Sequence, residues 1–244
     1  MANNISGFWN VAIGSSNQTL GALENASRTI ALGYSALGSL KSGSRNIGIG
    51  TFALAQLRNG KGNIGIGADT YYKGQGGNDN IAIGRASMGN TTQSINGNVC
   101  VGVSAGDQAS GDDNVCIGNR AGYYANSGNV FVGLNTGYSH RSGVNNTFIG
   151  RNAGYSGDQR TGDWNTCVGP SAAMNSGVSK SVAIGFQACA TKSNQVVLGN
   201  YSETPGNGTT ETLVHGNLVV RGTDGIMRRI VFNQDHSVSW ETVS

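Results

Sequence analysis

A five-residue unit recurs twelve times along this 244-residue chain and limits the possible folds more than any other feature. The unit consists of a polar residue, an apolar residue, a variable residue, a second apolar residue and Gly. It occurs first as NVAIG at 10–14 and last as QVVLG at 195–199, and successive copies end 14 to 19 residues apart. A short β-branched run that stops at Gly is typical of a strand followed by a turn. Repetition at this period, without helical periodicity, predicts one coil of a parallel β-solenoid per copy.

The composition agrees with a repeat fold and excludes several other classes of protein. The chain contains 40 Gly, 2 Pro and only 12% charged residues, whereas average proteins contain about 7% Gly and about 25% charged residues. Gly does not occur at every third position, which excludes collagen, and apolar clusters recur from residue 11 to residue 231, which argues against disorder. The net charge of +3 without a long basic run gives no indication of nucleic-acid binding. No apolar stretch reaches the length of a transmembrane helix, so we expect no membrane insertion.

Nine of the twelve copies begin with Asn. A column of identical amide side chains, one per coil, can hydrogen-bond to the coils on either side. We therefore expect these Asn residues to form a ladder along the solenoid and not a recognition surface.

The third residue of the unit is never polar or charged. Because side chains alternate along a strand, we expect the two flanking apolar residues to fill the coil and the third residue to point outward. A solvated outer face would carry polar residues there, so we predict that this row packs against other chains in a closed cyclic oligomer. The residues expected in this interchain core are Ala12, Ala31, Ala82, Cys100, Cys116, Phe131, Phe148, Cys167 and Val197.

Residues 181–199, SVAIGFQACATKSNQVVLG, resemble the head repeats of trimeric autotransporter adhesins, and the NIGIG series resembles the β-roll segments of bacteriophage tail fibres. This resemblance covers about residues 10–200. It implies an all-β, left-handed parallel β-roll of about twelve coils, assembled as a homotrimer, at a surface that contacts a bacterial or host cell. We find neither a signal peptide nor a C-terminal strand series of the length a membrane barrel needs. A virion fibre assembled in the host cytoplasm is therefore favoured over a cell-anchored adhesin.

Four segments are predicted along the chain. Residues 1–9 form an N-terminal cap or a peg for attachment to another virion protein, and residues 10–200 form the β-roll domain. Residues 201–217 form a connector. Residues 218–244 form a C-terminal β-hairpin cap, because the alternating runs RRIVF and SVSWETV flank an NQDH turn. Such a cap protects the open edge of the solenoid from unwanted pairing.

Tyr occurs five residues after the repeat Gly in three successive coils, and further aromatic and cationic residues lie in the nearby loops. A row of aromatic rings beside Arg and His can stack on sugar rings, but a structural packing ladder explains the same tyrosines, and both interpretations stay open. The candidate receptor contacts are Tyr123, Tyr124, Tyr138, His140, Arg141, Tyr155, Arg160 and Trp164. The longer inter-repeat segments at 71–79, 88–97 and 156–164 are further candidates, because binding residues concentrate in loops on rigid scaffolds.

The four cysteines show no metal-ligand or disulfide spacing. Cys100, Cys116 and Cys167 occupy the third position of the unit, and Cys189 lies in a sister segment. We expect them to act as small apolar residues, and we predict no metal and no cofactor.

Carboxylate pairs do not indicate catalysis. Asp112 with Asp113, and Asp158 with Asp163, lie in Gly-rich turns, and nothing in their spacing selects a glycosidase pair. The sequence therefore predicts a non-enzymatic tail fibre that binds a bacterial surface glycan or protein receptor and attaches to tail or baseplate proteins. A capsid-decorating fibre without its own receptor and a polysaccharide-depolymerising tailspike are the alternatives.

Overall fold

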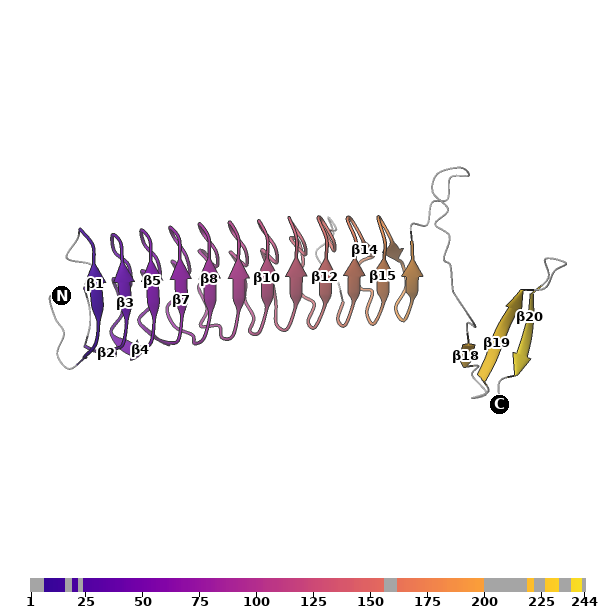
Figure 1. Ribbon diagram of the computed structural model, residues 1–244, viewed down its shortest axis with the longest axis horizontal. Coiled ribbons are helices and arrows are strands. Elements are labelled where there is room, and N and C mark those ends of the chain that lie inside the picture. The colour runs from indigo at the N-terminus through magenta and orange to yellow at the C-terminus, as the bar shows by residue number, and fades with distance from the viewer. Residues whose placement is uncertain are drawn as a thin grey trace. The chain divides into compact units, whose positions relative to one another are not determined.

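The structure is a computed structural model that describes residues 7–15, 19–21, 24–155 and 162–199, together with the backbone of three strands between 219 and 242. These residues form an all-β protein in which no helix is present, so none is long and apolar enough to cross a membrane. The chain divides into two compact units, Met1–Thr209 and Thr210–Ser244. In the larger unit, parallel strands stack coil upon coil as a β-solenoid (Figure 1).

A single sheet of twelve parallel strands follows the whole solenoid. Each strand consists of the three residues that precede Gly in one copy of the repeat, so every predicted copy contributes one strand. In sheet order the strands are β1 (Val11–Ile13), β3 (Ile30–Leu32), β5 (Ile47–Ile49), β7 (Ile64–Ile66), β8 (Ile81–Ile83), β9 (Val99–Val101), β10 (Val115–Ile117), β11 (Val130–Val132), β12 (Thr147–Ile149), β13 (Thr166–Val168), β15 (Val182–Ile184) and β17 (Val196–Leu198). Equivalent residues pair in register, as Cys116 does with Cys100 and with Phe131.

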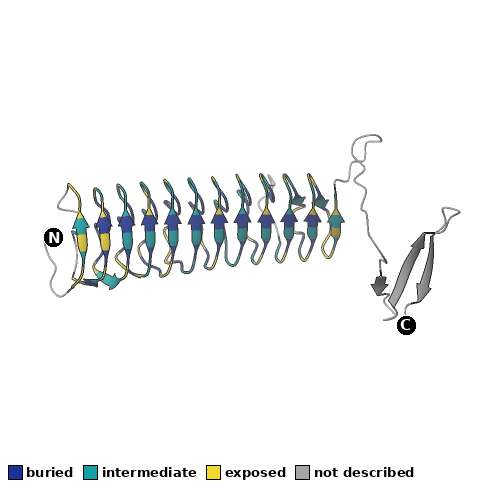
Figure 2. Ribbon diagram, viewed as in Figure 1, coloured by how far each residue is buried: buried dark blue, intermediate teal, exposed yellow. Residues whose placement is uncertain are grey.

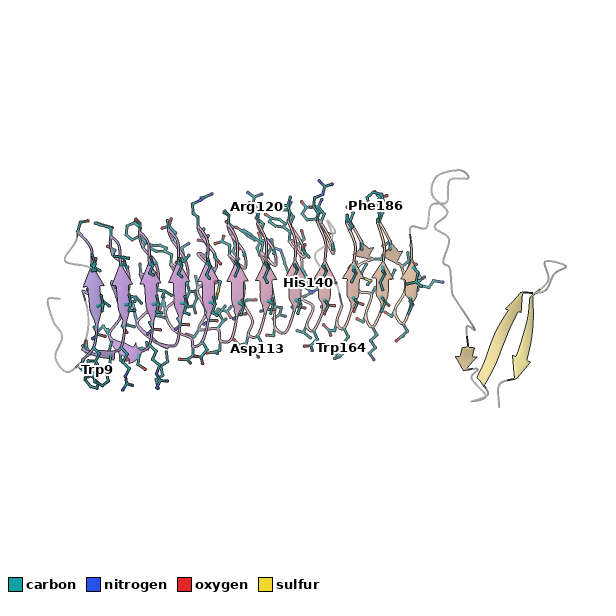
Figure 3. All side chains as sticks on the ribbon, viewed as in Figure 1. Trp9, Asp113, Arg120, His140, Trp164 and Phe186 are labelled. Atoms are coloured by element: carbon teal, nitrogen blue, oxygen red, sulfur yellow. The ribbon has the colours of Figure 1, made fainter. Side chains whose placement is uncertain are left out.

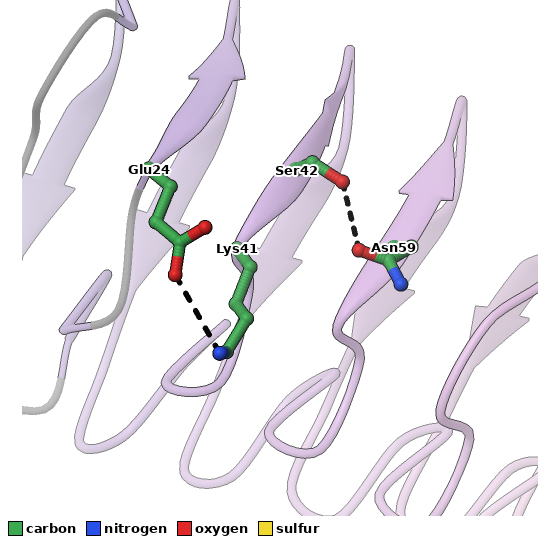
Figure 4. A network of polar contacts seen from close by, with 4 residues as sticks. All are labelled: Glu24, Lys41, Ser42 and Asn59. Carbon is green, nitrogen blue, oxygen red and sulfur yellow. Dashed lines mark hydrogen bonds and ion pairs between the residues drawn. The ribbon is translucent and has the colours of Figure 1, made fainter.

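Shorter parallel strands lie elsewhere in some of the coils. β2 (Asn25–Ser27), β4 (Ser42–Ser44) and β6 (Asn59–Lys61) form one small sheet, and β14 (Ala173–Met174) pairs with β16 (Cys189–Ala190). Figure 4 shows two contacts between neighbouring coils in the first of these regions. The Ser42 hydroxyl donates to Asn59 Oδ1 at 2.7 Å, and Lys41 Nζ lies 3.5 Å from Glu24 Oε1. Both ionic side chains are about half exposed, so the ion pair adds little to stability.

The predicted ladder of Asn side chains is confirmed. Asn63 Oδ1 accepts the backbone N–H of Asn80 at 3.2 Å and its side-chain amide at 3.0 Å. Asn80 Oδ1 accepts the same pair of donors from Asn98 at 3.1 Å each. The second amide hydrogen of Asn80 is directed to the Ile95 carbonyl at 2.6 Å. These side chains are fully buried, and satisfied amide networks of this kind specify a single register between coils.

The assignment of the two strand faces made from the sequence is wrong. The third residues of the units point into the coil of their own chain and not outward. Ala31, Ala82, Cys100, Cys116, Phe131, Phe148 and Cys167 are at most 1% exposed, and Ala12 and Val197 of the first and last strands are partly buried against the same core. The flanking apolar residues lie on the outside. Figure 2 shows this alternation along the strands.

The narrow interior explains why the third position carries small or variable apolar residues. Where this position is Gly48, a Cβ atom would lie 3.1 Å from Leu37 Cγ, so the leucine fills the space that Gly leaves. Farther along, Phe131 occupies the third position, and a Cβ on the facing Gly137 would lie 2.5 Å from its ring. A small residue on one side of the coil is thus matched by a large residue on the other side, so the interior stays close-packed. The residues of this row are apolar because they form the core, and no neighbouring chain is needed to bury them.

The smaller unit contains a three-stranded antiparallel sheet. It consists of β18 (Val219–Arg221), β19 (Met227–Phe232) and β20 (Val238–Thr242), with β19 in the centre. The predicted hairpin pairing is present between β19 and β20, where Ile230 lies opposite Trp240. The strand β18 was not predicted. The expected connector at 201–217 lies outside the described residues.

Candidate functional site

The outer surface of the twelve-stranded sheet, which we call the sheet face, is an apolar strip along the whole solenoid. It consists of the first and third residues of every strand, and apart from Thr147 and Thr166 all of them are Ile, Val or Leu. In-register pairing aligns them in two columns, as for Ile64 with Ile81 and Ile66 with Ile83. Most of these side chains are partly exposed, and the exposed fraction reaches 62% for Ile13 and 67% for Val196 in the first and last strands. Monomeric proteins rarely expose continuous apolar strips of this kind.

Four of the predicted receptor contacts form a tyrosine cluster, which we define as Tyr123, Tyr124, Tyr138 and Tyr155. The ring centroids of Tyr123 and Tyr138 are 5.0 Å apart, and those of Tyr138 and Tyr155 are 5.8 Å apart. Tyr124 packs edge-on against Tyr123 at 4.8 Å. Each of the three coils contributes to the row because Tyr recurs five residues after the repeat Gly. Tyr155 is 48% exposed, so the end of the row is open to solvent.

Arg141 belongs to the same group of side chains. Its guanidinium carbon lies 3.4 Å from the centre of the Tyr124 ring, a cation–π arrangement, and the residue is exposed. At the other end of the cluster, Gln108 Nε2 donates to the Tyr123 hydroxyl at 3.3 Å. Burial and a hydrogen bond with Asp107 raise the pKa of Tyr123 above its ordinary value. The phenol is therefore protonated at neutral pH and is a neutral hydrogen-bonding group within the cluster.

His140 is not a surface residue, contrary to the prediction. It is 1% exposed, and its ring packs against Phe131 at 5.4 Å and Phe148 at 5.3 Å. Its Nε2 lies 3.0 Å from the amide nitrogen of Asn146 in the Asn ladder. Burial lowers the pKa of His140 to about 4, so the ring is neutral at pH 7. The contacts with Phe131 and Phe148 hold this side chain in the core.

Trp164 is exposed but lies on another part of the coil. It directly precedes the Asn that begins the β13 repeat, and its exposed fraction is 54%. Figure 3 shows it at one edge of the solenoid, with Arg120 and Phe186 at the opposite edge. Its ring lies 5.6 Å from Lys180 Nζ. The last predicted contact, Arg160, lies outside the described residues.

Sequence reasoning missed a second aromatic group near the N-terminal end of the solenoid. Tyr34 packs edge-on against Phe52 at 5.3 Å, and Phe52 against Tyr72 at 5.7 Å. A pocket of about 240 Å³ opens beside Phe52 and Tyr72. One signal was present in the sequence, because Tyr72 also follows its repeat Gly, Gly67, by five residues. This single Tyr does not form a pattern, because the neighbouring coils carry Ala55 and Gly89 at that position.

The cysteines are free thiols and three of them are buried. Burial raises the pKa of Cys167 to about 12, and a hydrogen bond with Cys100 together with burial raises the pKa of Cys116 well above its usual range. A thiol that stays protonated is a poor nucleophile. Among the residues that the structure describes, no group of three or more His, Cys, Asp or Glu side chains is placed to hold a metal ion.

The carboxylates singled out from the sequence hold turns together. Asp112 Oδ1 accepts the Asn96 backbone N–H at 2.8 Å, and Asp163 Oδ1 accepts that of Val144 at 2.9 Å. Both bonds join one coil to the next. Asp158 lies outside the described residues.

Comparison of the chain with protein-family models, with curated proteins and with solved structures finds no match.

Proposed function

We propose that this chain is a virion fibre protein of the tail-fibre type, in which a rigid homotrimeric β-roll attaches the particle to a bacterial surface. The observation that carries the proposal is the sheet face. Its two columns extend over all twelve strands and consist of Ile, Val and Leu apart from Thr147 and Thr166, and burial of apolar surface stabilises by about 25 cal/mol per Å². A strip of this length favours a permanent partner of matching length, and another copy of the same chain supplies one.

The interchain core of this proposal differs from the one expected from the sequence. It consists of the outward residues of the sheet face, such as Ile66 and Ile117, which are 37% and 41% exposed. Three copies around a common axis bury these strips in a closed assembly, without leaving a surface for further growth. Trimerisation and left-handed winding of the coils follow the resemblance of residues 181–199 to adhesin head repeats. We place the antiparallel unit at β18–β20 as the C-terminal cap of the fibre.

The tyrosine cluster with Arg141 supports the attachment role. Aromatic rings present apolar faces with polar hydroxyl groups at the rim, and sugar rings combine the same two properties. A trimer displays three such clusters on one stiff body. Avidity then raises the effective affinity by about 10² to 10⁴ even when each contact is weak.

The proposal is tested by adsorption of the fluorescently labelled protein to a panel of bacterial strains with and without surface polysaccharide. We expect binding to at least one strain, and we expect Tyr138→Ala with Tyr155→Ala to reduce it at least tenfold. Trp164→Ala is the matched control, because it removes an exposed aromatic residue away from the cluster, and it leaves binding unchanged. Absence of binding to every strain contradicts the attachment role. Equal loss in the control contradicts the assignment to the tyrosine cluster.

A further inference from the structure

The pocket near the N-terminal end of the solenoid lies in the turns that follow β3, β5 and β7. It has a volume of about 240 Å³. Its lining includes the small residues Gly38 and Ala55 and the aromatic residues Phe52 and Tyr72. None of its lining residues belongs to the twelve-stranded sheet, so the sheet face and the pocket are separate surfaces.

The pocket exists because small residues replace tyrosine in one column of the solenoid. Backbone hydrogen bonds from Ser39 to Ala55 at 3.0 Å and from Gln56 to Tyr72 at 3.2 Å fix the register of three successive coils. In this register Gly38, Ala55 and Tyr72 are equivalent, each five residues after its repeat Gly. The tyrosine cluster occupies the same column with Tyr123, Tyr138 and Tyr155. Two small residues beside Tyr72 therefore leave a hollow, whereas the three successive coils of the tyrosine cluster carry Tyr at this position.

The walls of the pocket are aromatic and held in place. Phe52 is packed edge-on between Tyr34 and Tyr72, with centroid distances of 5.3 and 5.7 Å and interplanar angles of 88° and 71°. Such T-shaped contacts stabilise aromatic groups beyond the area that they bury. The rings are thus arranged before any ligand enters, which lowers the entropic cost of binding.

The remaining lining is polar and uncharged. Ser35, Ser39 and Gln56 belong to the lining, and the hydroxyl group of Ser39 and the amide of Gln56 can donate and accept hydrogen bonds. No charged side chain lines the pocket, so nothing in it compensates the burial of a phosphate, carboxylate or ammonium group. Aromatic walls with neutral hydrogen-bonding groups match a sugar ring that has an apolar face and hydroxyl groups.

The size of the pocket limits the ligand to about one ring. Its 240 Å³ equals about eight water molecules at ~30 Å³ each, and it lies below the range of about 300 to 1,000 Å³ typical of pockets for drug-sized ligands. Its open mouth allows the neighbouring units of a polymer to continue outside.

We propose that this pocket binds one neutral hexose unit of a bacterial surface polysaccharide. The inference rests on the proposed attachment function and adds a second contact to it, separate from the tyrosine cluster and different in charge. The cluster combines tyrosines with the cationic Arg141, whereas the pocket selects against charged sugars. One pocket of this size binds a free monosaccharide weakly, with a dissociation constant on the order of 1 mM, and three copies in a trimer compensate for this.

The test is saturation-transfer NMR of the full chain with the methyl glycosides of glucose, galactose, mannose and N-acetylglucosamine. We expect at least one of them to bind the wild-type protein. Ala55→Tyr fills the pocket with the residue that the same column carries at 72, 123, 138 and 155, and it abolishes the signal. Gln56→Ala, which removes only an amide, lowers the affinity severalfold. Phe186→Ala is the matched control, because it removes an exposed aromatic residue that belongs neither to the pocket lining nor to the tyrosine cluster, and it leaves the signal unchanged.

Two outcomes overturn the inference. One is the absence of binding of all four glycosides to the wild-type protein, and the other is retention of full binding by Ala55→Tyr once its thermal unfolding shows that it is folded. Cell adsorption separates this failure from that of the proposed function. If the wild-type protein adsorbs to bacteria while no glycoside binds, the pocket is not a sugar subsite and the attachment function stands. If no bacterium is bound, the attachment function itself is wrong.

Discussion

Gly84 illustrates how single residues determine the spacing of the coils. Its φ of +117° is one that side chains rarely adopt, and a Cβ atom there would lie 2.7 Å from the Gly102 carbonyl oxygen of the next coil. We expect Gly84→Ala to destabilise the solenoid by about 2 kcal/mol or more, because left-handed strain alone costs about 1–2 kcal/mol and the overlap adds to it. Thermal unfolding followed by circular dichroism measures the effect.

Ala86 provides the control in the same coil. Its φ is +55°, so Ala86→Gly relieves strain and leaves the unfolding temperature equal or higher. Equal stability of Gly84→Ala and the wild-type protein contradicts the role given to the closing Gly.

His140 makes the stability of the solenoid depend on pH. Its pKa is about 4 in the folded state against 6.5 for an ordinary His, so below pH 6.5 the unfolded chain binds the proton more readily. Its contribution is complete above pH 6.5 and is lost progressively as the pH falls toward 4, by about 3 kcal/mol at 1.36 kcal/mol per pKa unit. Unfolding temperatures at pH 7 and pH 4.5 should therefore differ less for His140→Gln than for the wild-type protein. An equal difference in both proteins contradicts the buried, neutral state of the ring.

At the scale of the strand, the repeat could be predicted from the sequence, but the side of each strand that faces the core could not. The β-branched run and the Gly of each unit correctly predicted twelve short parallel strands, and the leading Asn predicted the ladder. The orientation of the strands could not be predicted, because Ala31 in the middle and Ile30 and Leu32 beside it are all apolar, so alternation alone does not distinguish the inside from the outside. The inner side is recognised by the packing of Leu37 into the space beside Gly48. That contact joins two different coils, so it is visible only once their three-dimensional register is known.

The matching of small and large residues in the core predicts compensation between Phe131 and Gly137. Phe131→Ala leaves a cavity and is expected to cost about 3–5 kcal/mol, and Gly137→Leu alone overlaps the Phe131 ring. The double variant reproduces the pattern of the β3 coil, where Ala31 accompanies Leu37 in the core. We expect it to unfold at a higher temperature than either single variant, with coupling measured by a double-mutant cycle. If the losses of unfolding free energy of the two single variants simply add up in the double variant, the two positions do not compensate each other in the core.

At the scale of the whole molecule, part of the candidate surface was predictable. The five-residue offset from the repeat Gly located the tyrosine cluster, because identical offsets in successive coils place side chains side by side. The same offset did not distinguish the exposed tyrosines from His140, which lies only two residues beyond Tyr138 yet is buried in the core. The pocket at Phe52 and Tyr72 was not predictable from a local pattern, because it depends on small residues in two coils and aromatic residues from two coils.

The central claim is that the sheet face is buried between copies of the chain, and the native mass measured by light scattering tests it most directly. For the wild-type protein we expect the mass of three chains of 25.1 kDa each. We expect the same mass for Tyr138→Ala, and the mass of one chain for Ile66→Lys combined with Ile117→Lys on the sheet face. A wild-type protein with the mass of a single chain would contradict the claim.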